Sequence, residues 1–396
     1  KYTLLVSGLL FSLSAWGSGV PESLNELVIF RIIGGLGVGL ASMTAPMYVA
    51  EVAPPKERGR LVSFYQLAIV VGFFVVFLVT YFVGGGDTSN LSAQELEAIH
   101  HYNVEKGWRV MFWSELVPAL SFSILLFFVP HTPRWLMMKG REEEAKRVLV
   151  KVTSSPSEAA RELREIKASL NPEHSSTGPD SKAWTSGMWL VLFLGITLSI
   201  LQQVTGINAI LYYGAEIFSN ALGYGPEDAL KQQILLGGVN LVFTFIAISQ
   251  IDKWGRKPLL IVGTLGMFLG ITTLGASIYL DKLGLVSLIG MLTFIGSFAM
   301  SIGPVMWVML SEMFPNKVRS VAMSIAVAAN WLSNAIVTNT FPIINKSEVN
   351  EEVFNGSLSY FIFGGLCLVT IIFVWRLIPE TKGKTLEEMD ALWEKG

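Results

Sequence analysis

The hydrophobic residues of this chain are grouped into long uninterrupted runs, rather than spaced along one face of amphipathic helices. Each run is close to the roughly 20 residues that an α-helix needs to cross the hydrocarbon layer of a membrane. One or two such runs could be buried helices of a large soluble protein, but a whole series predicts membrane spans. The predicted spans are 2–19, 28–50, 61–83, 108–129, 187–213, 233–251, 258–280, 285–310, 320–343 and 357–378.

The composition supports an all-α membrane protein. Only 15% of the residues are charged and 52% are hydrophobic, whereas soluble proteins carry about 25% charged residues. The net charge of −2 leaves no electrostatic footprint for nucleic acid. The single cysteine, Cys367, excludes an internal disulfide framework and any multi-cysteine metal site. We therefore expect neither a cofactor nor a bound metal.

The basic residues alternate from loop to loop. The segments 51–60, 130–186, 252–257, 316–319 and 376–396 hold 22 Lys and Arg residues, whereas the alternate loops hold four, or five with Arg109. Positive residues stay on the cytoplasmic side of a membrane. The pattern predicts a multi-pass protein of the cytoplasmic (inner) membrane with both termini inside the cell.

The long loop in the middle of the chain differs in composition from the spans. Residues 140–170 are charged and helix-prone, and the spacing of Ala145, Val148, Leu149 and Val152 predicts short amphipathic helices. Residues 171–182 are rich in Pro, Ser and Gly, which is typical of a linker. The expected domains are a first bundle over 1–130, a cytoplasmic loop over 131–185, a second bundle over 186–378 and a tail over 379–396.

An internal repeat relates the two bundles. Glu51, Pro54 and Arg58 follow the second span, and Glu312, Pro315 and Arg319 follow the eighth span at a constant offset of 261 residues. Parallel repeats of this kind are typical of secondary transporters built from two halves.

Pairing the spans by this offset leaves the fifth and sixth spans without partners in the first half. The counterpart of the basic loop 252–257 would lie before Lys1. We therefore expect two further helices ahead of this chain, so that it holds ten of twelve spans and cannot transport alone.

Several motifs resemble the sugar porter branch of the major facilitator superfamily, most of all the bacterial D-xylose/proton symporters. They are D-K-W-G-R-K-P at 252–258, P-x2-P-R-W at 130–135, P-E-T-K-G-K at 379–384 and Q-Q-x2-G-I-N at 202–208. The resemblance implies two six-helix bundles, the first represented here by family helices 3–6. It also implies a central sugar site that opens alternately to the two sides of the membrane.

Polar side chains within the spans are candidates for the sugar site, because they are costly there and usually functional. Gln202 and Asn208 would point in different directions on an ideal helix, and Gly206 between them offers a place for the helix to break. Asn330, Asn334 and Thr338 form a stripe at helical spacing, and Trp307 follows an expected break at Gly303-Pro304. Hydrogen bonds between packed helices are the alternative role. The resemblance places the sugar contacts at Gln66, Gln202, Gln203, Asn208, Tyr212, Trp307, Asn330 and Trp331.

Two positions depart from the xylose symporter pattern. Phe73 and Asn330 stand where that pattern has glutamines, and asparagine at the second position is similar to the facilitative glucose carriers. The sugar is therefore a pentose or a hexose.

Two charged residues within the spans suggest coupling to protons. Arg31 and Glu115 should each have a partner or titrate, because an unpaired ion within a membrane is expensive. In proton-coupled relatives, an aspartate on the first family helix pairs with the arginine that matches Arg31. A helix-end arginine that reaches the membrane surface is the alternative for Arg31.

The ends of the two bundles carry charged residues that could pair across the cleft and close it. This expected cytoplasmic gate comprises Glu51, Arg58, Arg134, Asp252, Arg256, Glu312 and Arg319. His131 replaces an acid usual in the family, which could make this side pH-sensitive.

The sequence thus predicts a sugar transporter, not an enzyme, that works as a monomer in the lipid bilayer and carries a monosaccharide together with a proton. A facilitative uniporter is the alternative within this class. A membrane sugar sensor that binds without transporting is the alternative from another class, although the short tail after the last span argues against it.

Overall fold

The computed structural model describes residues 1–54, 57–87, 91–153, 155–170, 186–214, 216–217, 226–315, 318–384, 388–389 and 393. Each predicted span falls on a helix or on a pair of consecutive helices in this part of the chain. Nine of these stretches are long and apolar enough to cross a membrane, and the first helix has 17 residues.

The helices of the first half are α1 (Tyr2–Ser18), α2 (Leu24–Val52), α3 (Arg58–Val83), α4 (Ala93–Tyr102), a π-helical turn (Asn103–Gly107), α5 (Trp108–Ser114) and α6 (Leu116–Phe128). Those of the second half are α10 (Ser186–Val204), α11 (Ile207–Tyr212), α13 (Pro226–Trp254), α14 (Arg256–Tyr279), α15 (Leu285–Met300), α16 (Ile302–Met313), α17 (Arg319–Asn345), α18 (Glu348–Glu352) and α19 (Leu358–Leu377).

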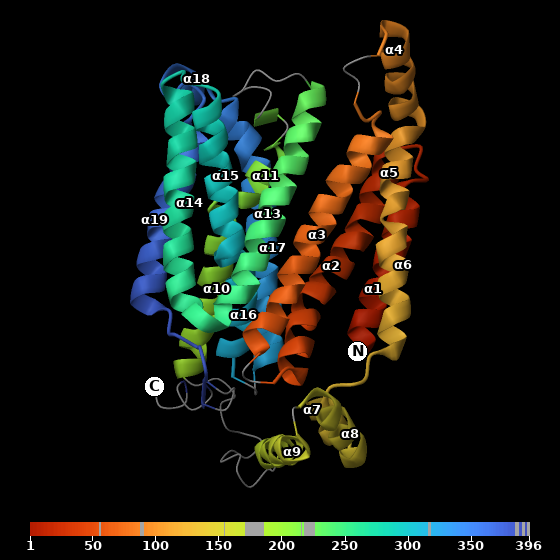
Figure 1. Ribbon diagram of the computed structural model, residues 1–396, viewed down its shortest axis with the longest axis vertical. Helices are drawn as coiled ribbons and strands as arrows, with labels where there is room; N and C mark the ends of the chain where they lie inside the picture. Colours follow the sequence, from red (N-terminus) through yellow and green to blue (C-terminus); the bar gives the residue numbers. More distant parts are fainter. Residues whose placement is uncertain are drawn as a thin grey trace.

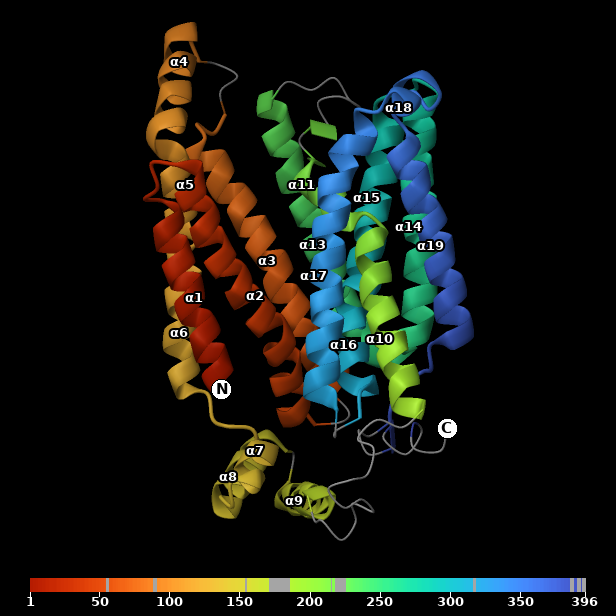
Figure 2. The same cartoon turned by 180° about the vertical axis from the view of Figure 1, so that it is seen from behind.

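The two halves form two helical groups that lie side by side (Figures 1 and 2). Within the first group α1 packs against α2 and α6, and within the second α14 packs against α15 and α19. The groups meet where α3 contacts α13 and α16, and where α2 contacts α17. Any path through the middle of the molecule is therefore bordered by α2, α3, α13, α16 and α17.

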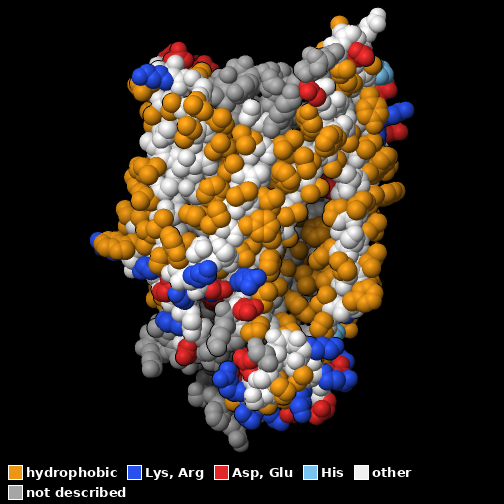
Figure 3. Space-filling view, viewed as in Figure 1, with side chains coloured by type: hydrophobic (Ala, Val, Ile, Leu, Met, Phe, Trp, Pro, Cys, Tyr) orange, Lys and Arg blue, Asp and Glu red, His pale blue; other side chains and the backbone are white. Residues whose placement is uncertain are grey.

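The surface is apolar over most of its height and charged at its ends (Figure 3). Large side chains such as Phe128, Val117 and Leu24 are more than 70% exposed. Exposed apolar area of this extent marks an interaction surface, and hydrocarbon does not disfavour these side chains. Lys and Arg side chains gather at the lower end in Figure 3, which we call the basic end.

Three short helices lie at the basic end (Figure 1). They are α7 (Pro133–Met138), α8 (Glu142–Val152) and α9 (Pro156–Leu170). Leu136, Ala145 and Val148 form a small apolar core of their own, which Leu163 joins. The amphipathic helices predicted over 140–170 are therefore confirmed. The predicted linker over 171–182 lies outside the described residues.

The break predicted at Gly303-Pro304 is at the wrong place. The helix is interrupted at Ser301, between α15 and α16, where the backbone has φ −130° and ψ −101°. Pro304 lies in the first turn of α16 instead, where its missing N–H costs no intrahelical hydrogen bond.

A second break, not predicted, separates α5 from α6 at Glu115. Pro118 explains it, because a proline clashes with the carbonyl four residues earlier and cannot donate to it.

Candidate sugar site and gate

A break in the fifth predicted span brings its polar residues together. The helix α10 ends at Val204, and α11 begins at Ile207. Gly206 between them has φ +91°, in the left-handed region that glycine adopts without strain. Its Cα lies so close to α19 that a Cβ would stand 2.4 Å from the Phe363 ring. The prediction that Gly206 redirects this span is confirmed.

Five amide side chains meet beside this break. Gln203 donates to Asn330 Oδ1 (3.1 Å) and accepts from Asn208 (2.7 Å) and Asn334 (3.1 Å). Asn330 donates to Gln202 Oε1 (2.8 Å) and to the carbonyl of Ser199. We call Gln202, Gln203, Asn208, Asn330 and Asn334 the amide cluster.

The amide cluster joins the broken helix to the break at Ser301 and to α17. Gln202 donates to the carbonyls of Ile302 and Gly303, at the start of α16. Thr338, the third residue of the predicted stripe, does not bond to the amide side chains of the cluster. Its hydroxyl donates to the backbone carbonyl of Asn334 instead. Amides carry both donors and acceptors, so this cluster offers the groups that sugar hydroxyls need.

The other sugar contacts implied by the resemblance lie on both halves. Gln66 on α3 is buried, as is Trp307 on α16. Trp331 on α17 is half-buried and donates through Nε1 to Ser42 on α2 (3.3 Å). Tyr212 is exposed, and its ring lies 6.3 Å from that of Phe73. Two groups of aromatic rings therefore lie at the interface between the halves. One contains Trp307 and Trp331, and the other contains Tyr212 and Phe73.

Sequence reasoning missed two residues at this interface. Tyr65 donates to Ser42 Oγ (2.7 Å), and its ring packs edge-on against Trp307 at 4.9 Å. Tyrosine and serine are common in membrane helices, so only the position of Tyr65 directly before Gln66 could have drawn attention to it.

The charged residues within the spans pair with each other. Arg31 Nη1 lies 3.5 Å from Glu115 Oε2, and the guanidinium lies 5.3 Å from the centre of the Phe112 ring. The prediction that each has a partner is confirmed. Both side chains are half exposed to the surroundings, at 50% and 41%. Glu115 is the residue at the break between α5 and α6.

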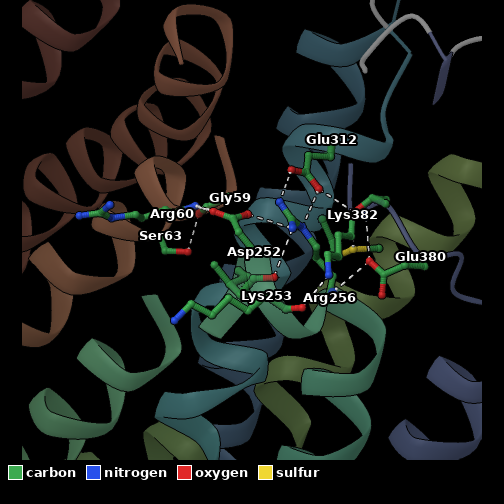
Figure 4. Close-up of polar contacts among 12 residues, drawn as sticks. Gly59, Arg60, Ser63, Asp252, Lys253, Arg256, Glu312, Glu380 and Lys382 are labelled. Atoms are coloured by element: carbon green, nitrogen blue, oxygen red, sulfur yellow. Dashed lines mark hydrogen bonds and ion pairs between the residues drawn. The ribbon is translucent and has the colours of Figure 1, made fainter. Parts of the chain in front are cut away.

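A second polar cluster lies at the basic end (Figure 4). Arg256 at the start of α14 forms a two-pronged ion pair with Glu312 (2.8 and 3.1 Å) and a further one with Asp252 (3.0 Å). Bidentate guanidinium–carboxylate pairs are among the strongest in proteins. Arg256 and Glu312 are both buried, at 3% and 7% side-chain exposure, so removing either partner would leave a buried charge.

One contact between the halves at this end joins a backbone group to a side chain. The backbone N–H of Arg60, in the first turn of α3, donates to Asp252 Oδ2 of α13 (3.0 Å). Gly59 permits this approach, because a Cβ there would lie 2.2 Å from Arg256 Nη2 and 2.4 Å from Asp252 Oδ1. The ion pairs of Arg256 with Asp252 and Glu312 join residues of the second half.

The repeated arginines bind backbone carbonyls within their own halves. Arg58 donates to the Ala50 carbonyl (3.1 Å) and Arg319 to that of Phe314 (3.0 Å). Each bond thereby connects the start of one helix to the end of the helix before it. Among the described residues, no ion pair joins Glu51 or Arg134 to the Arg256 cluster.

The tail motif supplies further members that were not predicted as gate residues. Glu380 accepts from the backbone N–H groups of Arg256 and Lys257, both at 3.0 Å. Thr381 donates to Glu312 (2.6 Å), and Lys382 donates to the Lys253 carbonyl. Their occurrence in the P-E-T-K-G-K motif was the available signal.

His131 lies between α6 and α7, where its ring stacks on that of Trp135 at 4.0 Å. Burial lowers the pKa of His131 from its ordinary value, and the neighbouring positive charge of Lys1 acts in the same direction. The histidine is therefore neutral at pH 7.

Comparison with known proteins identifies the family of this chain. Residues 1–393 match the family model described as "Sugar (and other) transporter". The D-xylose-proton symporter of Escherichia coli is 44% identical over 99% of this chain and 80% of its own length.

Two solved structures of the xylose transporter XylE resemble this chain to different degrees. The xylose symporter bound to 6-bromo-6-deoxy-D-glucose covers 99% of this chain and 83% of its own, with 43% identity and a TM-score of 0.85. The inward open conformation has 42% identity over 99% and 82% of the two chains, with a TM-score of 0.71. The helix pairing, the broken helices and these matches together place the chain in the sugar transporter family of the major facilitator superfamily.

Proposed function

We propose that this protein carries a monosaccharide across the cytoplasmic membrane by alternating access, together with a proton. The amide cluster carries the proposal, because it gathers five hydrogen-bonding side chains of the second half beside a broken helix. Trp307 and Trp331 add aromatic faces for the sugar ring, and Gln66 adds an amide from the first half.

The sugar is a pentose or a hexose. A relative is named for D-xylose, and a similar structure holds a glucose analogue. Phe73 lies near Tyr212 at the interface and offers an apolar surface where a glutamine would offer hydrogen bonds. Asn330 is the residue that the resemblance associates with the facilitative glucose carriers, which keeps a hexose among the candidates.

The basic end faces the cytoplasm in this proposal, since Lys and Arg concentrate there. Residues 1–130 and 186–378 then form the two moving bundles, of which the first also includes the two helices expected before Lys1. The loop 131–185 joins the bundles, the tail 379–396 follows them, and the transporter works as a monomer. The hydrogen bond between Arg60 N–H and Asp252 closes the cytoplasmic side. The lower TM-score against the inward open structure agrees with that closed state.

Arg31 and Glu115 are the groups proposed for proton coupling. A carboxylate beside a guanidinium in a membrane can be protonated and released from its ion pair in turn. A facilitative uniporter would keep the same sugar site without this response.

The test is uptake of labelled D-xylose and D-glucose by the full-length protein, with the two helices expected before Lys1, in proteoliposomes. We expect counterflow exchange of at least one sugar, and net accumulation only with an inward proton gradient. The variant Glu115→Gln should keep exchange and lose accumulation, whereas the control Glu105→Gln, which removes an exposed carboxylate beside His101, should keep both.

Three results would contradict the proposal in distinct ways. Binding without exchange would indicate the sensor. Exchange that ignores the proton gradient would indicate the uniporter. Absence of both binding and exchange for a panel of monosaccharides would overturn the sugar site itself.

A further inference from the structure

The interface between the halves contains a hydrogen-bonded unit built around one buried serine. Ser42 on α2 is 1% exposed, and its Oγ accepts from Tyr65 OH on α3 and from Trp331 Nε1 on α17. A hydroxyl oxygen has two lone pairs, so it can accept both bonds at once. The bond from Tyr65 stays within the first half, and the bond from Trp331 crosses between the halves.

Tyr65 makes a second crossing contact. Its ring lies edge-on to the Trp307 ring of α16, at 4.9 Å and 73°, a favourable geometry for two aromatic rings. Ser42 and Tyr65 together therefore hold both tryptophans of the proposed sugar site from the opposite half.

The contact between Tyr65 and Trp307 lies closer to the cytoplasmic end than the amide cluster does, and Trp331 follows Asn330 of the cluster directly on α17. Counted along their helices at about 1.5 Å per residue, Tyr65 and Trp307 are roughly 10 Å from the cytoplasmic ends of α3 and α16. Asn330 of the amide cluster is roughly 16 Å and Trp331 roughly 18 Å from the cytoplasmic end of α17. Separation of the halves at the cytoplasmic end must break or displace the contacts that lie below the sugar.

The indole of Trp331 has one N–H and can make one strong hydrogen bond. It can donate to Ser42 or to a sugar hydroxyl, but not fully to both. A sugar that takes this donor removes the bond that crosses from Trp331 to Ser42.

We propose that Ser42 and Tyr65 are positioning residues that hold the cytoplasmic side closed and yield when a sugar engages Trp331. This inference rests on the proposed function for the role of the sugar, but the closure itself can be measured without sugar. In this proposal, Ser42 and Tyr65 couple the binding of a sugar to the movement of the two halves.

The test measures the separation of the cytoplasmic ends with spin labels in proteoliposomes. Labels at Glu57→Cys on the first half and Lys253→Cys on the second, both exposed positions, are placed in a Cys367→Ala background. Tyr65→Phe keeps the ring and removes one hydrogen bond, so it should raise the sugar-free fraction with separated ends about five-fold. Ser42→Ala removes both bonds and should raise that fraction further.

Matched controls remove similar groups that act within one half. Tyr213→Phe removes a hydroxyl that donates to the Thr338 carbonyl of the same half. Ser7→Ala removes a buried hydroxyl bonded inside α1. Both controls should leave the separation unchanged, and D-xylose or D-glucose should widen the ends less in Ser42→Ala than in the unaltered protein.

An unchanged separation in Tyr65→Phe and Ser42→Ala, or an equal change in the controls, would overturn the inference. A shift in the sugar-free distances together with no response to any sugar would keep the closure role and refute the proposed sugar function instead.

Discussion

At the residue scale, Gln203 is the centre of the amide cluster because it bonds to four other amide side chains. Gln203→Leu leaves Asn208 and Asn334 without their acceptor, and a buried polar group without a partner costs about 1–3 kcal/mol. We expect sugar affinity to fall at least about ten-fold in equilibrium binding. Gln250→Leu, which changes an amide of α13 outside the cluster, should bind as before, and equal affinities would argue against the site.

His131 gives a prediction for pH. Its pKa is lowered in the folded protein from the ordinary 6.5, so the unfolded chain binds the proton more readily. The stability that depends on neutral His131 is therefore complete above pH 6.5 and is lost as the pH falls below it. Against His131→Gln, the melting temperature of the unaltered protein should drop more between pH 7.5 and 5.5. Parallel curves would exclude this role.

Individual residues were the least predictable level of the site. The amides and tryptophans could be named because polar or large aromatic side chains within a span are conspicuous. Ser42 and Tyr65 could not, because their importance comes from contacts between segments that are 23 and 289 residues apart. Periodicity along one helix carries no information about such contacts.

At the scale of elements, helix lengths were predictable because the hydrocarbon thickness sets them, whereas the breaks were only partly so. Gly206 was recognised as a break because its neighbours had to converge, but the interruptions at Ser301 and Glu115 depend on how prolines three residues downstream fit their helices. Backbone geometry at such points is decided by tertiary packing as well as by composition.

The break at Gly206 can be tested directly. Gly206→Ala forces a Cβ against the Phe363 ring in a left-handed backbone conformation. We expect a loss of about 1–3 kcal/mol in the free energy of unfolding, and weaker sugar binding, because Asn208 then turns away from Gln203. Gly365→Ala on α19, where a Cβ meets nothing within 4 Å, is the control. Equal melting temperatures for the two variants would contradict the prediction that the break requires glycine at position 206.

At the scale of the whole molecule, the repeat predicted two related halves, but the sequence does not indicate which side of the membrane is closed. That choice rests on contacts such as the one from Arg60 N–H to Asp252. Two conformations of one chain contain the same helices with the same local preferences. The free-energy difference between them therefore comes from a few individually weak bonds at the interface between the halves.

Asp252 provides the corresponding prediction. Asp252→Asn weakens the bond across the halves, so a cysteine at the buried Ser63 on α3 should react with a maleimide about three- to ten-fold faster. Glu380→Gln also removes a carboxylate beside Arg256 but contacts only the second half, and it should leave the rate unchanged. Similar rates in all three proteins would show that Asp252 does not control closure.

The Asp252 contact also supplies a hydrogen-bond acceptor to the first turn of α3. The first turn of a helix has N–H groups without intrahelical partners, and the group at Arg60 obtains its acceptor from the opposite half. Separation of the halves therefore uncaps α3, and its first turn must find water or fray. Because the donor is backbone, any residue except proline can occupy position 60 without losing this bond, so substitutions of the Arg60 side chain alone would leave the coupling intact.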